Sequence, residues 1–249
     1  MRLILALFLL FLLTTISPLY AGQAAHTELT KEKAIEVLNG IRGEVVNVQP
    51  AEVPGLFQVD MKMQGKVVPI YLDAKGEYLF SGNVIRIKDR KNLTQAAFQK
   101  LNPVDLSEIP LEDALVLGLP EAPQKVIVFT DPHCPFCSKF HKVLHEIVEN
   151  HPEIAFYIKL VPFKPSSKQI TQTILCNKSM EQLEKAFAGE SLPEPACESD
   201  VIGNNMMLAN KLGINGTPSS VLPNGIISPG YKSAEELVKA IEENRAVDK

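Results

Sequence analysis

Two cysteines, Cys134 and Cys137, bracket a Pro-Phe dipeptide in the stretch DPHCPFCSKF, which covers residues 131–140. Two thiols at this spacing can ligate a metal, cross-link the chain or exchange a disulfide with another molecule. A second couple, Cys176 and Cys197, lies further along the chain and is far more widely spaced. Which chemistry each couple performs depends on the elements that position it.

The elements predicted around Cys134 favour disulfide exchange. KVIVFT (125–130) is a continuous apolar run, typical of a strand buried on both faces. Apolar residues then recur at helical spacing over 136–148, so Cys134 stands where a helix begins, with Pro135 at the first helical position. The first-turn N–H groups lack helical partners and would stabilise a thiolate at Cys134. Cys137, one turn further on, is predicted to be the buried, resolving thiol.

Other interpretations of this couple fit less well. Zinc commonly requires a second close pair of ligands, and His141 is expected along the helix surface. Haem attachment requires a histidine after the second cysteine, where this chain has Ser138. A purely structural disulfide would close a very small loop and so constrain little. His133 is either a positive neighbour of the sulfur or an ordinary exposed turn residue.

The wider couple favours a structural role. Cys176 ends an apolar helical stretch, and Cys197 follows the loop LPEPAC. A disulfide closing a loop of this length stabilises a fold by about 3 kcal/mol in the chain-entropy model. We therefore predict a structural Cys176–Cys197 disulfide, with a second redox pair as the alternative.

A proline directly before a predicted strand is a further unusual feature. Gly216-Thr217-Pro218 precedes SSVL, and proline cannot donate a hydrogen bond within a central ladder. Most X–Pro bonds are trans. A cis Thr217–Pro218 bond, in contrast, would leave backbone groups free to pair with an extended polypeptide facing the active sulfur.

The first residues predict a secretory signal peptide at 1–21, with cleavage after Ala21. A short basic start is followed by the apolar run Leu3–Leu13 and by small and turn residues. A membrane anchor is the alternative, but the run is shorter than the roughly 20 residues that span a bilayer. Export would place the cysteines where disulfides persist. The net charge of −4 gives no indication of a nucleic-acid partner.

The rest of the chain divides into two parts. LTKEKAIEVLNG (29–40) predicts a helix closed by Gly40, and the runs EVVNVQ, LFQVDMKM, VVPIYLD and EYLFSGNVIRI predict strands. A core of about 60 residues is marginal alone. The open edges of its sheet carry unpaired backbone groups, and pairing with a second copy of the chain would satisfy them, so we expect a dimer. A stable monomeric module is the alternative. NLTQAAFQKL (92–101) predicts a connecting helix, and the proline-rich segment 103–123 is expected to cross the surface.

The second part continues after KVIVFT and its helix with a buried strand at 153–163. Residues 166–212 are expected to be mostly helical. A hairpin around Pro223-Asn224-Gly225 and the final helix SAEELVKAIEEN complete the predicted order of elements.

Taken together, these motifs resemble the periplasmic DsbC/DsbG family of thiol:disulfide interchange proteins, which are disulfide isomerases. VFTDPHCPFC is similar to the strand and active-site turn of that family, and NGTPSSVLPNG to its cis-proline loop and hairpin. LFQVDMKMQGKVVPIYLDAKGEYLFSGNVI resembles its N-terminal dimerisation domain. Cys176 and Cys197 stand where the family has a structural disulfide.

The resemblance implies an α+β fold in three parts after the signal peptide. These are a cystatin-like dimerisation domain at 22–89, a linker helix at 90–102 and a thioredoxin-like catalytic domain at 103–249, with a helical insertion at about 164–212. It also implies a V-shaped homodimer whose two active sites face an uncharged cleft that holds misfolded proteins.

The implied activity is isomerisation or reduction of incorrect disulfides in exported proteins. Cys134 and Cys137 would be catalytic and Thr217 and Pro218 substrate-binding, with no metal or organic cofactor. A membrane thiol reductant of the DsbD type would keep the site reduced. The Pro-Phe dipeptide departs from the Gly-Tyr of the best-known isomerase. A dithiol oxidant of the DsbA type and a periplasmic chaperone or binding module therefore remain as alternatives.

Overall fold

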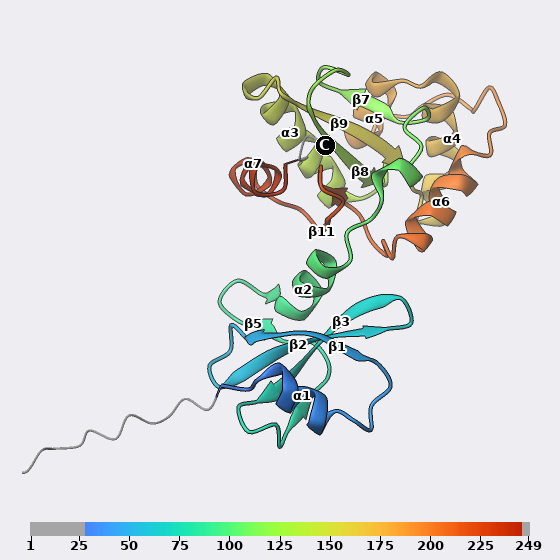
Figure 1. Cartoon of the computed structure of the whole chain (residues 1–249). Coiled ribbons are helices and arrows are strands. Elements are labelled where there is room, and N and C mark those ends of the chain that lie inside the picture. The colour runs from blue at the N-terminus through green and yellow to red at the C-terminus, as the bar shows by residue number, and fades with distance from the viewer. Residues whose placement is uncertain (1–27, 246–249) are drawn as a thin grey trace, which may run out of the picture.

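The computed structural model describes residues 28–245, so the predicted signal peptide lies outside the described residues. Within that range, no helix combines the length and the apolar character needed to cross a membrane. The chain forms two sheet-containing parts, with one helix between them (Figure 1).

The N-terminal part is a four-stranded antiparallel sheet with one helix against it. The strands run in the order β1 (Glu44–Pro50), β2 (Leu56–Met63), β3 (Lys66–Asp73) and β4 (Leu79–Phe80), and α1 (Lys31–Val37) packs on β1. The small core between helix and sheet is apolar and includes Ala34, Val59, Met61 and Leu72. The predicted helix on a small antiparallel sheet is therefore present.

Two predicted boundaries in this part are wrong. Helix α1 ends at Val37 rather than at Gly40, because the buried Leu38 already serves as its C-terminal cap. The fourth predicted strand is also interrupted. Its second half, β5 (Ile85–Arg86), pairs with β6 (Lys91–Asn92) instead, since Gly82 breaks the extended run with a φ of 142°.

Helix α2 (Leu93–Leu101) connects the two parts and is fastened to the first. Asn92 caps its start by accepting a hydrogen bond from the Gln95 N–H (2.9 Å). At its end, the Asn102 side chain accepts from the Val67 N–H (2.9 Å) and donates to the Val67 carbonyl (2.8 Å). Because Val67 belongs to β3, the connecting helix is held against the N-terminal sheet.

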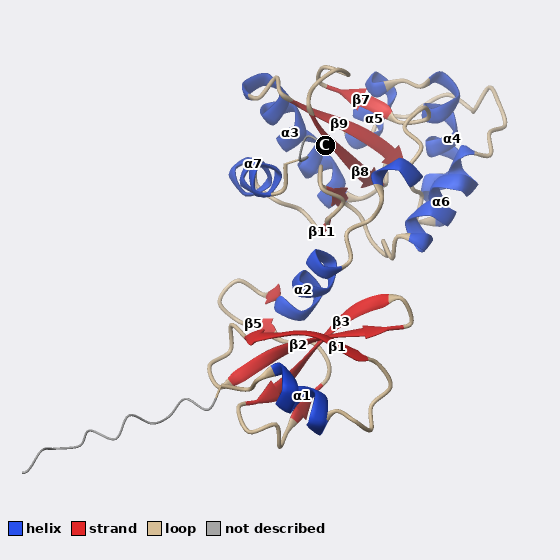
Figure 2. Ribbon diagram, viewed as in Figure 1, coloured by secondary structure: helices blue, strands red, loops and turns tan. Residues whose placement is uncertain are grey.

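The C-terminal part is built on a five-stranded sheet in the order β11-β10-β8-β9-β7. Figure 2 shows β7, β8 and β9 of this sheet with helices around them. The strands are β7 (Leu115–Leu117), β8 (Gln124–Thr130), β9 (Ile154–Leu160), β10 (Ser219–Val221) and β11 (Ile227–Pro229). Strands β8 and β9 are parallel, and the other neighbouring strands are antiparallel.

Helices cover both faces of this sheet, as the continuous apolar sequence of β8 predicts. The helices are α3 (Pro135–Asn150), α4 (Lys168–Asn177), α5 (Met180–Phe187), α6 (Val201–Lys211) and α7 (Ala234–Glu243), with short 3₁₀ turns at Leu106–Glu108 and Pro165–Ser167. Val126 and Val128 pack among α3, α4, α5 and α7. Ile127 and Phe129 pack on the other face, where Ala209 of α6 lies. Successive side chains of a strand point to opposite faces, so β8 contributes to both cores.

The proline-rich segment 103–123 is not confined to the surface, which corrects the sequence expectation. It contains β7, which pairs with β9 and buries Leu115 and Leu117. Lys159 of β9, only 1% exposed, holds this segment by pairing with Asp113 and donating to the Pro110 carbonyl (2.8 Å). A buried cation needs such partners. The prolines of this segment therefore lie on either side of a strand of the sheet, and the segment does not simply run over the surface.

Candidate active site

The turn between β8 and α3 presents the first cysteine at the start of the helix. Cys134 is the N-terminal cap of α3 in extended conformation, and Pro135 occupies the first helical position. Ser138 donates its N–H to the Cys134 carbonyl (3.1 Å), which closes the first helical turn. The predicted position of Cys134 at the junction of strand and helix is therefore confirmed.

A buried carboxylate, Asp131, organises this turn. Its oxygens accept hydrogen bonds from the His133 N–H (2.8 Å), the Ser167 hydroxyl (2.6 Å) and the Lys164 N–H (3.2 Å). Lys164 also donates from its ammonium group to the His133 carbonyl (2.9 Å). The sequence analysis assigned no role to Asp131. Its place directly after a buried strand was the available signal that its carboxylate would need internal partners.

The two thiols differ in their access to solvent. Both are free, Cys134 is partly exposed, and Cys137 is buried with 1% of its surface exposed. Burial is the main cause that raises the pKa of Cys137 to about 12, and the hydrogen bond with the Cys134 side chain adds to it. Hydrogen bonds involving the backbone of Asp131 and the side chains of Thr130 and Thr217 act in the opposite direction. Cys137 is therefore a neutral thiol at neutral pH.

The Cys134 sulfur faces the loop before β10. Its thiol donates to the Thr217 carbonyl (3.4 Å), and it accepts no capping hydrogen bond from the first turn of α3. The expected hydrogen bond between the sulfur and the helix N–H groups is thus not present in the structure, where the sulfur lies against the Thr217 carbonyl instead.

The Thr217–Pro218 peptide bond is cis, and it directly precedes β10. Ser219 lies opposite Phe129 near the end of β8, so the sheet brings Thr217 beside Cys134 although 83 residues separate them. Thr217 is partly exposed and Pro218 is buried. The predicted cysteine couple and the predicted proline loop therefore lie together at one end of the sheet.

Exposed aromatic side chains lie on the segments around the thiols. Phe136, between the cysteines, is 60% exposed. Phe163 is exposed next to Lys164, whose ammonium group binds the active-site turn, and Tyr231 is exposed directly after Gly230, which donates to the Pro218 carbonyl (2.8 Å). The residues around the two thiols thus expose several apolar rings to solvent.

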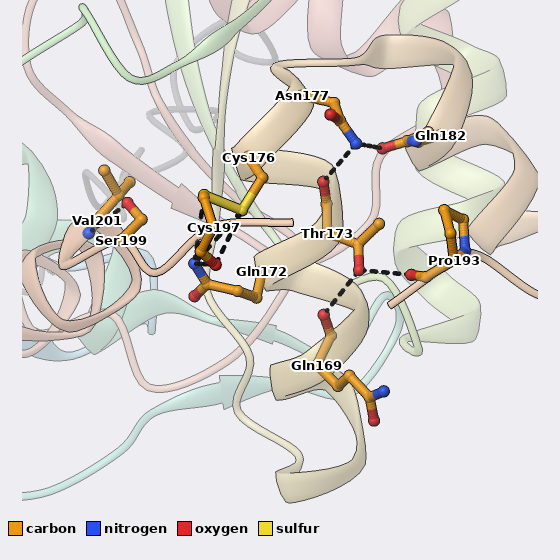
Figure 3. The surroundings of a disulfide bond; sticks show 10 residues. All are labelled: Gln169, Gln172, Thr173, Cys176, Asn177, Gln182, Pro193, Cys197, Ser199 and Val201. Atoms are coloured by element: carbon orange, nitrogen blue, oxygen red, sulfur yellow. Dashed lines mark hydrogen bonds between the residues drawn. A yellow bond between two sulfur atoms is a disulfide. The ribbon is translucent and has the colours of Figure 1, made fainter. Parts of the chain in front are cut away.

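The wider cysteine couple is joined in the structure. Cys176, near the end of α4, forms a disulfide with Cys197, and their Cα atoms are 5.7 Å apart. Figure 3 shows that Gln172 donates to the Cys197 carbonyl (3.2 Å) and that Thr173 donates to the Pro193 carbonyl (2.9 Å). The disulfide and these hydrogen bonds together fasten the loop between α5 and α6 to α4.

His141 does not lie along the helix surface as the sequence indicated. The packing of α5 on α3 leaves it only 6% exposed, and its ring contacts Phe187. Burial, together with the neighbouring His145, lowers the pKa of His141 to about 4. Among the described residues, His141, His145 and Glu184 form a group able to hold a metal ion, and neither active-site cysteine belongs to it.

Comparisons with known proteins match both parts of the chain. Residues 22–95 match the disulfide bond isomerase protein N-terminal domain, and residues 111–245 match the thioredoxin-like domain. The thiol:disulfide interchange protein DsbC of Escherichia coli K12 is 23% identical over 241 residues, which cover 94% of this chain and 96% of that protein. The probable thiol:disulfide interchange protein DsbC of Bordetella pertussis is 26% identical over 214 residues, covering 85% and 73%.

Among solved structures, Proteus mirabilis ScsC in a transitional conformation is 25% identical, with a TM-score of 0.47 over 53% of this chain and 71% of that one. The two domain matches, in this order along the chain, confirm the predicted α+β fold class with a thioredoxin-like C-terminal domain.

Proposed function

Because the chain belongs to the DsbC family of thiol:disulfide interchange proteins, we propose that it isomerises or reduces incorrect disulfides of exported proteins through Cys134 and Cys137. The observation that carries this proposal is the asymmetry of the two thiols. Cys134 is partly exposed beside the Thr217 carbonyl, whereas Cys137 is buried one helical turn away with a raised pKa. An accessible sulfur suits attack on a substrate, and a protected neutral thiol suits a later resolving step.

The first step is attack by the Cys134 thiolate on one sulfur of a substrate disulfide. A Cys134–substrate disulfide forms, the substrate S–S bond breaks, and the second substrate sulfur leaves as a thiolate. The Thr217 carbonyl, freed from the Cys134 thiol, can then accept a hydrogen bond from the backbone of an extended substrate. We assign substrate binding to Thr217 and Pro218 on this basis.

Two outcomes follow from the mixed disulfide. If another substrate thiolate attacks the substrate sulfur, a new substrate disulfide forms, and Cys134 is released unchanged in oxidation state. If Cys137 gives up its proton and attacks the Cys134 sulfur instead, the Cys134–Cys137 disulfide forms. The substrate then leaves with both its sulfurs reduced, having received two electrons from the protein. Reduction therefore requires an electron donor, which we assign to a membrane thiol reductant of the DsbD type.

We assign residues 22–89 to dimerisation, 90–102 to the linker and 103–249 to the catalytic domain with a helical insertion at about 164–212. Exposed apolar residues around β4 and β5 support pairing with a second copy, and these are Tyr78, Leu79, Phe80, Ile85 and Ile87. Ile87 alone is 91% exposed. Burial of such a group against a partner removes apolar surface from water.

We place the protein in the periplasm, to which the signal peptide proposed at 1–21 would direct it. The Cys176–Cys197 disulfide supports this location, because structural disulfides persist in oxidising compartments. We assign that disulfide a structural role, and the proposed reaction uses no metal or organic cofactor.

The test is recovery of ribonuclease activity from scrambled ribonuclease, with the processed chain and three variants. We expect Cys134→Ser to abolish recovery. Cys137→Ser should retain isomerisation through substrate thiols and lose reduction of the substrate. Met207→Ala, an exposed position of α6, is the control and should behave as the parent protein.

Two results would contradict the proposal. Full recovery with Cys134→Ser would favour a chaperone or binding module, since the sulfur would then be dispensable. A fully oxidised Cys134–Cys137 couple in the exported, resting protein would favour a dithiol oxidant of the DsbA type.

A further inference from the structure

A second group of chemically competent side chains lies away from the cysteines, where α5 packs against α3. His141 Nε2 and His145 Nε2 are 3.2 Å apart, and Glu184 Oε1 lies 3.1 Å from His145 Nε2 and 3.8 Å from His141 Nε2. We propose that these three atoms bind one zinc ion and so form a metal site separate from the disulfide-exchange site.

The three distances fit a common metal ion. A circle through atoms with these separations has a radius of about 2.0 Å, close to the Zn–N and Zn–O distances of about 2.0–2.2 Å. One ion can therefore contact all three atoms at ordinary bond lengths with small side-chain adjustments.

The fold positions the ligands before any metal arrives. His141 and His145 are separated by one helical turn on α3, so they project from the same face. Glu184 comes from α5, whose end is fixed to α3 by two contacts. Phe187 packs on the His141 ring at 5.2 Å between centroids, and Ser138 donates to the Phe187 carbonyl (3.3 Å). Neighbouring helices thus supply a preorganised pair of imidazoles and a carboxylate.

Burial and charge also suit a divalent transition metal. His141 is buried, and the Glu184 carboxylate supplies negative charge. The side chains of His145 and Glu184 are 39% and 45% exposed, which leaves access for the ion and for water as a fourth ligand. Two histidines, one glutamate and one water form a known tetrahedral zinc set.

A bound ion would join the helical insertion to the helix that carries the exchange cysteines. Cys137, His141 and His145 follow one another at four-residue intervals along α3. Zinc would therefore fix α5 to the helix whose first turn holds Cys134.

The test is calorimetric titration of Zn²⁺ into the processed chain with Cys134 and Cys137 joined as a disulfide, which prevents those thiols from binding zinc. We expect one ion per chain and a higher melting temperature with zinc. Glu184→Gln and His145→Ala should each weaken zinc binding by more than about tenfold, because even outer-shell partners of metal ligands contribute about 10–100-fold. Both side chains are partly exposed, so these variants should fold, which circular dichroism checks.

Glu181→Gln is the matched control. It makes the same substitution on the same helix, at an exposed carboxylate that pairs with Lys185, and should bind zinc as the parent does. Equal binding by the parent and Glu184→Gln would overturn the proposal, as would no binding by the parent. A titration with Cu²⁺ tests the choice of metal, because copper binds most nitrogen and oxygen sites more tightly than zinc does. If the site binds Cu²⁺ and does not bind Zn²⁺, the assignment to zinc is wrong.

Discussion

Replacing both cysteines of the Cys176–Cys197 disulfide by serine should lower the free energy of unfolding of the thioredoxin-like domain by about 3 kcal/mol. The bond links residues 21 positions apart, and the chain-entropy model gives about that value for such a loop. Neither cysteine is buried, so little packing is lost with the sulfurs. In the folded state, Gln172 and Thr173 still hold the loop through the Cys197 and Pro193 carbonyls. The effect therefore arises mainly in the unfolded chain, which gains conformational freedom.

Calorimetry and guanidinium unfolding followed by circular dichroism measure this change. The chain has no tryptophan, so intrinsic tryptophan fluorescence cannot report it. Every sample carries Cys137→Ser, and Cys134 is alkylated where it is present, so that no free thiol exchanges with the Cys176–Cys197 disulfide. A loss of about 3 kcal/mol should lower the melting temperature of a domain of this size by about 10 °C. The denaturant slope m should increase, because the unlinked unfolded chain exposes more surface.

Cys134→Ser is the matched control, because it makes the same substitution at a partly exposed thiol that closes no loop. It should change the melting temperature far less. The reasoning from loop entropy is refuted if the Cys176→Ser/Cys197→Ser variant unfolds at the parent's midpoint. It also fails if the control is destabilised as much as the double variant.

Four further predictions concern other parts of the chain. Lys159→Met should lower the free energy of unfolding by about 3 kcal/mol, measured by denaturant unfolding. This value is at the low end of the range for breaking a buried ion pair, because Asp113 keeps some contact with water. An unchanged unfolding midpoint would contradict this prediction. In the reduced protein at pH 7, iodoacetamide should label Cys134 and spare Cys137, with mass spectrometry as the measurement. The raised pKa keeps Cys137 protonated until about pH 12, and reduced protein should lose stability between about pH 9 and 12, where only the unfolded state releases that proton. Phe80→Glu, at an exposed edge position, should shift sedimentation of the processed chain toward a monomer, whereas an unchanged dimer would place the interface elsewhere.

Local patterns were enough to predict the parts of the site that depend on neighbouring residues. The apolar run of β8 required burial on both faces, and Cys134 followed it at the start of an amphipathic helix. The helix predicted at 92–101 likewise matches α2, which begins after Asn92 because that side chain accepts a hydrogen bond from an otherwise unpaired helix N–H.

The parts that depend on distant residues could not be predicted in this way. Asp131 finds its hydroxyl partner in Ser167, 36 positions along the chain, and His141 is buried only because α5 packs against it. Strand β7 has only three residues and lies between prolines, so its sequence is too short to show the alternation of apolar and polar residues that predicts a strand. It joins the sheet by pairing with β9. In each case a contact with a distant residue decides the hydrogen-bond partner, the burial or the strand pairing, and the local sequence carries no signal of that contact.

The double hydrogen bond between Asn102 and Val67 makes α2 a rigid spacer rather than a flexible tether. Beyond it, Val104 donates to the Gly225 carbonyl (2.8 Å), and a Cβ on Gly225 would lie 2.1 Å from the Val104 oxygen. Both neighbours of Pro103 are therefore anchored, Asn102 to the N-terminal sheet and Val104 to the turn between β10 and β11. Extra residues inserted at Pro103 would separate the Asn102 anchor from the Val104 anchor and so uncouple the C-terminal part of the chain from the N-terminal sheet.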